Sequence, residues 1–223
     1  MTIQVVNNHF LVSLEADDFL KCETFTTNVV NTNLEQYAKR GQKDPKAIYK
    51  QIMEGKLAEI AVEKLMKSLG IKTSEVDFGI YDKKHKSWAP DLVTDFGSVH
   101  VKSMCTKQAK KYTLSWTFQA GRSWDTDKLI SQAKEDDYIA LVEVNDTDYT
   151  QPIKIVGLIN FNHILANDLL KHPKLPQLLG IKKVLYYTDI QDLIVTTLWS
   201  AVEKKYQESK VFVQMHENEY WRN

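Results

Sequence analysis

Three residues that could together hold a metal ion and a phosphate lie close together near the middle of the chain. Asp91 follows a proline, and His100 and Lys102 come shortly after it. Apolar and polar residues alternate on both sides of Asp95-Phe-Gly-Ser98, which is typical of two strands joined by a tight turn. With Phe96-Gly97 at the centre of the turn, Asp91 lies opposite Lys102. Because side chains two apart share a strand face, Asp91, His100 and Lys102 are predicted to project together.

The other face of this hairpin is apolar and is expected to enter the core, with Leu92, Val99 and Val101 on it. An aspartate opposite a lysine is within reach of one small ligand, such as a metal ion with its phosphate. The alternative is an ordinary ion pair between the two strands.

The order Pro90-Asp91, a short gap and x-x-Lys ending at Lys102 resembles the PD-(D/E)XK motif of the restriction-endonuclease-like nucleases. The resemblance implies that Asp91 and the residue two before Lys102 hold Mg²⁺. It also implies that Lys102 contacts the attacked phosphate or the attacking water. The chain departs from the family at His100, where the family usually has Glu or Asp.

A long helix is predicted upstream of the motif. Asp44-Pro45 is a strong helix start, and Gly70 ends the helix after Leu69. At about 100° per residue, Glu59 falls inside an apolar stripe. Burying an unpaired carboxylate is costly, so a metal ion or a cation is expected nearby. The alternatives are that Glu59 pairs with a basic side chain in the core or lies at the edge of the stripe. The stripe consists of Ile48, Ile52, Gly55, Val62, Met66 and Leu69.

The segment Glu54-Gly-Lys-Leu-Ala-Glu59 is similar to the first core helix of many restriction-endonuclease-like proteins, which implies that Glu59 assists metal binding. Mg²⁺ prefers oxygen ligands, whereas a neutral imidazole suits Mn²⁺ better. His100 is therefore open to three roles: a metal ligand, a general base, or a hydrogen-bond partner of a metal-bound water.

The rest of the chain reads as α/β (α+β), a mixed β-sheet flanked by helices. The expected strands are 3–6, 10–14, 76–81, 112–119, 138–144, 153–159 and 183–187. The expected helices are 34–40, the segment from Asp125 or Thr126 to Lys134, 162–170, 176–179 and part of 189–206. With 112–119 as an insertion, residues 44–145 follow the order αβββαβ, which is the core order of the resembled fold. We expect one domain, 1–223, with elaborations at 1–43 and 146–223.

Composition places any nucleic-acid surface in local patches. The chain has 223 residues with 29 basic and 29 acidic ones, so its formal net charge is zero. Basic residues gather at the start of the long helix and in an expected loop, 106–111, after Lys102; the alternative is that they are simply solvated. The candidate DNA contacts are Lys39, Arg40, Lys43, Lys46, Lys107, Lys110, Lys111 and Arg122.

The resemblance implies an endonuclease that hydrolyses phosphodiester bonds in double-stranded DNA with Mg²⁺, or Mn²⁺, as cofactor. A type II restriction enzyme acting as a homodimer is the first expectation. A repair, junction or phage-type nuclease and a non-cleaving DNA-binding protein of the same fold are the alternatives, followed by a structural protein in which Glu59, Asp91 and Lys102 form a salt-bridge cluster. Two cysteines and the absence of a leader or a membrane-length apolar run favour a cytoplasmic protein without membrane contact.

Overall fold

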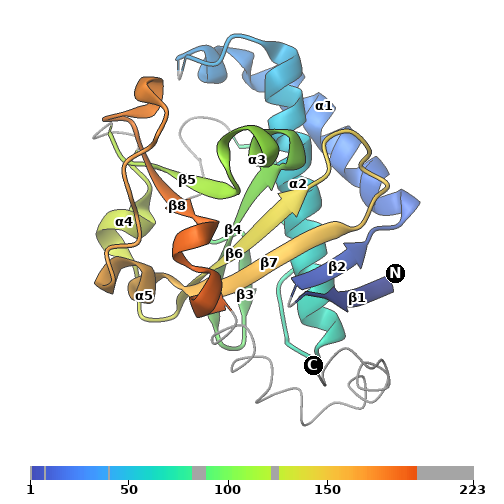
Figure 1. Ribbon diagram of the computed structural model, residues 1–223. Coiled ribbons are helices and arrows are strands. Elements are labelled where there is room, and N and C mark those ends of the chain that lie inside the picture. The colour runs from blue at the N-terminus through green and yellow to red at the C-terminus, as the bar shows by residue number, and fades with distance from the viewer. Residues whose placement is uncertain (1, 8, 40, 82–88, 122–125, 195–223) are drawn as a thin grey trace.

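The computed structural model describes residues 2–7, 9–39, 41–81, 89–121 and 126–194, and it has a mixed α/β fold with a curled sheet flanked by helices (Figure 1). The main sheet has the strand order β1-β2-β7-β6-β4-β3, and a smaller sheet pairs β5 with β8. Every pair of neighbouring strands is antiparallel except β4 and β6, which run parallel. The strands are β1 (Thr2–Val6), β2 (His9–Ser13), β3 (Leu92–Thr94), β4 (Gly97–Cys105), β5 (Ser115–Gln119), β6 (Asp137–Val144), β7 (Ile153–Asn160) and β8 (Lys182–Tyr186).

The predicted long helix is α2 (Pro45–Ser68), and its ends follow the local signals. The Asp44 side chain accepts a hydrogen bond from the backbone N–H of Lys46 at 2.9 Å. Gly70 takes a positive φ of +71° just after the helix, a conformation that glycine adopts without strain. The prediction of this helix is confirmed.

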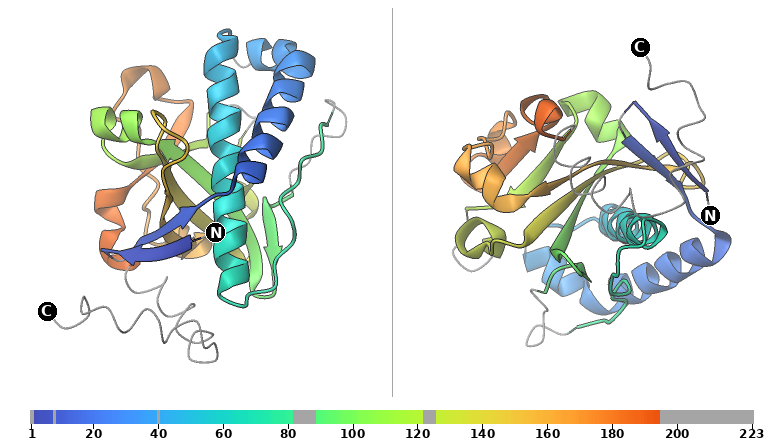
Figure 2. Two further views of the ribbon diagram at one scale, coloured as in Figure 1. Left: turned by 90° about the vertical axis from the view of Figure 1, so that its right-hand side faces the viewer. Right: turned by 90° about the horizontal axis from the view of Figure 1, so that it is seen from below.

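The helix α2 is covered on two sides, by α1 (Ala16–Lys39) and by the sheet (Figure 2). The prediction of only a short helix, at 34–40, in this part of the chain is wrong, because the helix begins at Ala16. Threonine, asparagine and valine in this segment are weak helix formers. However, Cys22, Thr26 and Val29 recur at helical spacing and are buried, so packing outweighs propensity.

The sheet divides two apolar clusters. One face packs against α2 and contains Val99, Ala140 and Val142, whereas the other contains Ile139 and Leu141. This second face is covered by the β5–β8 sheet and by the short helices α4 (Lys128–Gln132) and α5 (Phe161–Ala166). A chain segment with two 3-10 turns, η1 (Pro176–Leu178) and η2 (Tyr187–Asp189), flanks β8.

Three local predictions near the motif are wrong. Residues 76–81 form no strand; instead Thr73 bridges Thr94, and the N–H of Ser74 donates to the carbonyl of Val93 at 2.8 Å. The expected basic loop is a helix, α3 (Thr106–Tyr112). The cap of α4 is Asp127, whose carboxylate accepts from the N–H of Leu129, and not the predicted Thr126; Asp125, the other predicted cap, lies outside the described residues. No helix in the described ranges combines the length and apolar character needed to cross a bilayer.

Candidate functional site

The hairpin β3–β4 carries the motif, but its register differs from the prediction. Leu92 pairs with Val99 and Thr94 with Gly97, so Asp95 and Phe96 are the central turn residues. This register sets Asp91 across from His100 and not from Lys102. The shift keeps the parity of the pairing, and side chains therefore stay on the predicted faces.

Asp91, His100 and Lys102 line one cleft of about 1010 Å³. The cleft lies on the face of the sheet opposite α2. One of its walls comes from Gly41 and Gln42, between α1 and α2, and another from the segment 177–182. The remaining lining residues are Ala89, Pro90, Ser98, Gln119, Asp127, Lys128, Leu129, Gln132, Lys134 and Asp137.

Asp91 is fixed by the neighbouring strand. Its Oδ2 accepts the backbone N–H of Val101 at 2.7 Å. Its other oxygen, Oδ1, makes no hydrogen bond with the described residues and is available to a ligand.

Glu59 does not line the cleft, but it interacts electrostatically with Asp91. Burial raises the pKa of Glu59 to about 8, and the negative charge of Asp91 adds to this shift. The Lys56 ammonium opposes the shift, because its Nζ lies 2.5 Å from Oε2 of Glu59. Lys56 is held there by the carbonyl of Asp77 at 2.7 Å and by the face of the Phe25 ring, whose centroid is 5.0 Å away. The expectation of a cation beside Glu59 is therefore met by Lys56.

Two aspartates that the sequence analysis did not single out hold the other motif residues. Lys102 Nζ lies 2.9 Å from Asp127 Oδ2 and 5.3 Å from the centroid of the Phe118 ring. His100 Nε2 lies 3.7 Å from Asp137 Oδ1. The alternation of polar and apolar residues on β4 could have identified the face that carries His100 and Lys102. Nothing in the sequence around Asp127 or Asp137, however, marks these aspartates as partners of the motif.

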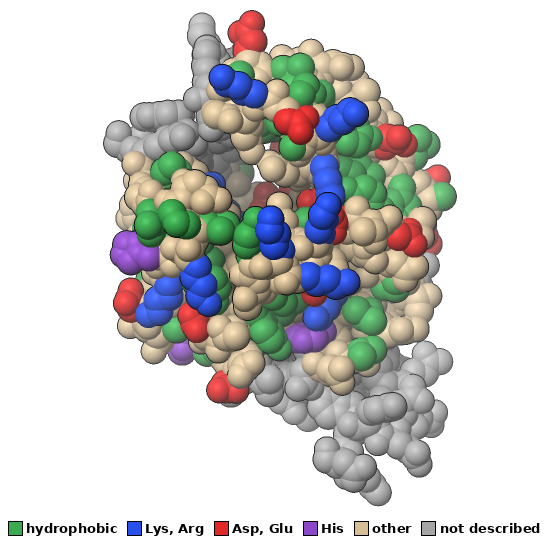
Figure 3. Space-filling model, turned by 45° about the horizontal axis from the view of Figure 1, so that its top comes forward, with side chains coloured by type: hydrophobic (Ala, Val, Ile, Leu, Met, Phe, Trp, Pro, Cys, Tyr) green, Lys and Arg blue, Asp and Glu red, His purple; other side chains and the backbone are tan. Residues whose placement is uncertain are grey.

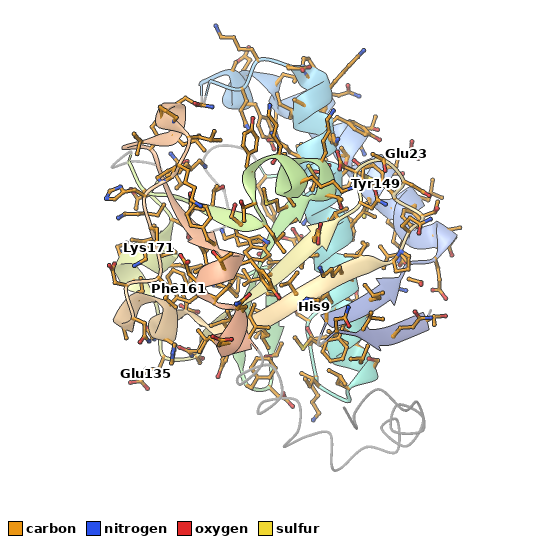
Figure 4. The ribbon with its side chains drawn as sticks, viewed as in Figure 1. His9, Glu23, Glu135, Tyr149, Phe161 and Lys171 are labelled. Carbon is orange, nitrogen blue, oxygen red and sulfur yellow. The ribbon has the colours of Figure 1, made fainter. Side chains whose placement is uncertain are left out.

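Another set of potential ligands lies elsewhere. Glu54, Cys105 and Asp146 are the one group of three in the described chain whose ligand atoms lie within 4.8 Å of one another. Asp91, Glu59 and His100 do not form such a group. Lys50 Nζ lies 2.5 Å from Asp146, and the hydroxyl of Tyr149, labelled in Figure 4, donates to Glu54 at 3.4 Å.

The group of Glu54, Cys105 and Asp146 is explained by polar contacts between α2 and the loop that joins β6 to β7. Burial raises the pKa of Glu54 to about 7, and the positive charge of Lys50 works against that shift. Because Lys50 already neutralises Asp146, the group has a partner without a metal ion.

The predicted DNA contacts fall in two places. Lys43 and Lys46 are exposed at the start of α2, beside the wall of the cleft formed by Gln42. The exposed lysines Lys107, Lys110 and Lys111 lie on α3. Figure 3 shows lysine side chains gathered in the middle of one face, next to a hollow. Lys39 belongs to the end of α1, whereas Arg40 and Arg122 lie outside the described residues.

Comparison with known proteins returns no match. No protein-family model, no curated protein and no solved structure is similar to this chain. The functional argument therefore depends on the geometry of the cleft.

Proposed function

We propose that this protein is a metal-dependent DNA endonuclease with a restriction-endonuclease-like core. The observation that carries the proposal is the convergence of Asp91, His100 and Lys102, from the β3 and β4 arms of one hairpin, in a single cleft. The electrostatic contact of Glu59 with Asp91 adds the helix carboxylate that the resemblance calls for.

The order of elements supports this core for residues 44–145. α2, β3, β4, α4 and β6 come in this order, with α3 and β5 inserted between β4 and α4, and β4 runs parallel to β6. The first strand of the expected αβββαβ order is reduced to the bridge between Thr73 and Thr94 at the edge of β3. The segments before 44 and after 145 extend the sheet and cover its second face, as parts of the same domain.

In this proposal Asp91 and Glu59 would hold a divalent cation between them, although Lys56 already pairs with Glu59. Two carboxylates that repel one another are both stabilised by a cation between them. Asp91 Oδ1 and Glu59 Oε1 have no hydrogen-bond partner among the described residues and could serve as ligands. Mg²⁺ or Mn²⁺ bound there would neutralise phosphate charge and activate water. His100, the third ligand of this proposal, adds an imidazole, which favours Mn²⁺.

Lys102 and His100 supply the remaining chemistry. Lys102 would exchange Asp127 for a phosphate oxygen and stabilise the negative charge that develops during attack. Where His100 is not a metal ligand, it would instead take the proton of the attacking water, and Asp137, 3.7 Å from its Nε2, would orient the ring in either role.

The partner in this proposal is duplex DNA. Its phosphates would contact Lys43 and Lys46 at one wall of the cleft and the lysines of α3 beyond it. A homodimer matches the twofold symmetry of a palindromic site and would cut both strands, as a type II restriction enzyme does. The two buried free cysteines, Cys22 and Cys105, fit a reducing cytoplasm.

The test is cleavage of long duplex DNA with Mg²⁺ or Mn²⁺, followed by sequencing of the ends. Asp91→Asn keeps an acceptor for the N–H of Val101 but removes the charge, and it should abolish cleavage, as should Lys102→Ala. Lys154→Ala is the control for Lys102, because Lys154 is a similarly exposed strand lysine paired with Glu143 at 3.3 Å. Cuts at one defined site would identify a restriction enzyme, whereas cuts at junctions or ends would indicate a repair or phage-type nuclease.

A specific observation favours a second candidate, a DNA-binding protein of the same fold that does not cleave. Lys102 is already paired with Asp127, and the predicted metal ligands lie too far apart to form a compact group. Tight duplex binding without any cleavage in either ion would establish that function and remove the first.

A further inference from the structure

A second pocket, of about 480 Å³, lies between α3 and the β5–β8 sheet. It is within the size range of small-ligand sites. Leu178 of η1 lines both this pocket and the catalytic cleft, so the two cavities adjoin. Of its lining residues, the function proposed above uses Lys111 alone, as a contact to duplex phosphates.

The lining of the second pocket is selective for anions. It contains two lysines, Lys111 and Lys174, and no described lining residue is an aspartate or a glutamate. The catalytic cleft differs in this respect, because Asp91, Asp127 and Asp137 line it. Hydroxyl groups also line the second pocket, on Ser103, Tyr112, Thr113, Thr117 and Tyr186, whereas the lining hydroxyl of Ser115 already donates to the carbonyl of Thr113 at 3.1 Å.

The two lysines are held without carboxylate partners in the described chain. Lys111 Nζ lies 4.9 Å from the centroid of the Tyr112 ring, and Lys174 Nζ lies 4.7 Å from that of Tyr186. A cation above an aromatic face is positioned while its N–H groups stay available to an acceptor. Both ammonium groups can therefore bind an anionic oxygen without breaking an ion pair.

Apart from Gln108, the rest of the lining is apolar. Met104, Pro173, Leu175, Leu178 and Val184 contribute this part of the surface. A simple inorganic anion would need no such surface. The pocket combines hydrogen-bond donors with an apolar wall. A ligand that matches both parts has a phosphate, which accepts from the donors, joined to a flat ring, which packs against the wall.

Backbone strain lies at the edge of the same pocket. Thr113 has φ +73° and ψ 143°, a region that β-branched residues rarely occupy. Such residues cluster at binding sites, where the surrounding structure holds them in place.

We propose that this pocket binds a nucleotide, with its phosphate on Lys111 and Lys174 and its base against the apolar wall. The nucleotide is either a free mononucleotide or one unit of a nucleic-acid strand that runs past Leu178 from the cleft. The proposal does not depend on cleavage at Asp91 and stands or falls separately from it.

The experiment is calorimetric titration of the full chain, in EDTA, with dTMP, thymidine, inorganic phosphate and a short single-stranded oligothymidylate. We expect dTMP to bind at least about tenfold more tightly than thymidine or phosphate, because each of these lacks one half of the ligand. Lys111→Gln and Lys174→Gln should each weaken dTMP binding by about tenfold, as a charge-assisted hydrogen bond is lost.

Two further variants separate the pocket from general effects. Lys171→Gln is the matched control, because Lys171, labelled in Figure 4, is exposed on the same segment as Lys174 but lies outside the lining. Thr117→Phe should block the pocket from an exposed strand position, and thermal melting checks that each variant is folded. Absence of dTMP and oligonucleotide binding overturns the proposal, as does equal binding of inorganic phosphate or an equal loss in Lys171→Gln. Tighter binding of the oligonucleotide than of dTMP assigns the pocket to a strand, and the reverse assigns it to a free nucleotide.

Discussion

Replacing Glu59 by glutamine should make the stability of the protein less dependent on pH. Burial and the charge of Asp91 raise the pKa of Glu59 to about 8, whereas the pKa of an unperturbed glutamate is 4.5. Between these values the folded chain holds a proton that the unfolded chain has released. The wild-type protein therefore loses stability as the pH rises through this window, and the glutamine variant lacks that loss.

The size of this change in unfolding free energy follows from the shift in the pKa of Glu59. Each pH unit inside the window costs the wild type about 1.4 kcal/mol of unfolding free energy. From pH 5.5 to 7.5 the variant should therefore gain about 2.7 kcal/mol relative to wild type, as an upper estimate. Loss of the contact with Lys56 at 2.5 Å adds a cost, but Lys56 keeps its bond to the carbonyl of Asp77 at both pH values.

Urea unfolding at pH 5.5, 6.5 and 7.5, followed by fluorescence of the buried Trp116, measures the slope. Glu63→Gln is the control, because Glu63 lies one turn further on α2, has the same side-chain exposure of 13%, and also pairs with a lysine at 2.5 Å. A difference between Glu59→Gln and wild type that is flat or falls with rising pH would refute the reasoning. It would mean that Lys56 keeps Glu59 ionised in the folded protein.

Two further substitutions test the site and the hairpin. His100→Glu restores the carboxylate of the resembled family and should move the metal preference of cleavage from Mn²⁺ toward Mg²⁺; an identical metal profile would remove His100 from the site. Gly97→Ala should destabilise the fold by at least about 2 kcal/mol in urea unfolding, since φ is +146° and a Cβ would lie 2.1 Å from the carbonyl oxygen of Asp136. Gly55→Ala, whose Cβ meets nothing within 4 Å in α2, is its control and should be stabilising, and a loss of stability in both would contradict the argument.

The sequence alone determined the features that depend on a few neighbouring residues. Asp44, Pro45 and Gly70 set both ends of α2, because a cap acts within one turn. Apolar runs predicted β6 and β7 almost to their ends. Alternation predicted that His100 and Lys102 share one face, since this follows from the pleat of any strand.

Tertiary structure decided the features that depend on distant partners. α1 is a helix because α2 gives it an apolar surface to cover, despite its weak helix formers. The segment after α2 pairs with β3 at Thr73, because the edge of β3 offers its backbone groups there, and residues 76–81 have no such strand beside them. The centre of the hairpin turn lies one residue earlier than predicted, at Asp95-Phe96. Gly97 therefore begins β4, with a φ of +146° that other residues avoid.

The surroundings of the motif belong to this second group. Lys102 meets Asp127 across 25 residues of chain, and His100 meets Asp137 because β4 and β6 run side by side in parallel. A parallel pair needs a crossover connection, and the length and course of that connection are not written in a local pattern. The sequence therefore indicated the residues that could do chemistry, whereas the crossover connection through α4 and the pairing of β4 with β6 decided that Asp127 and Asp137 lie next to them.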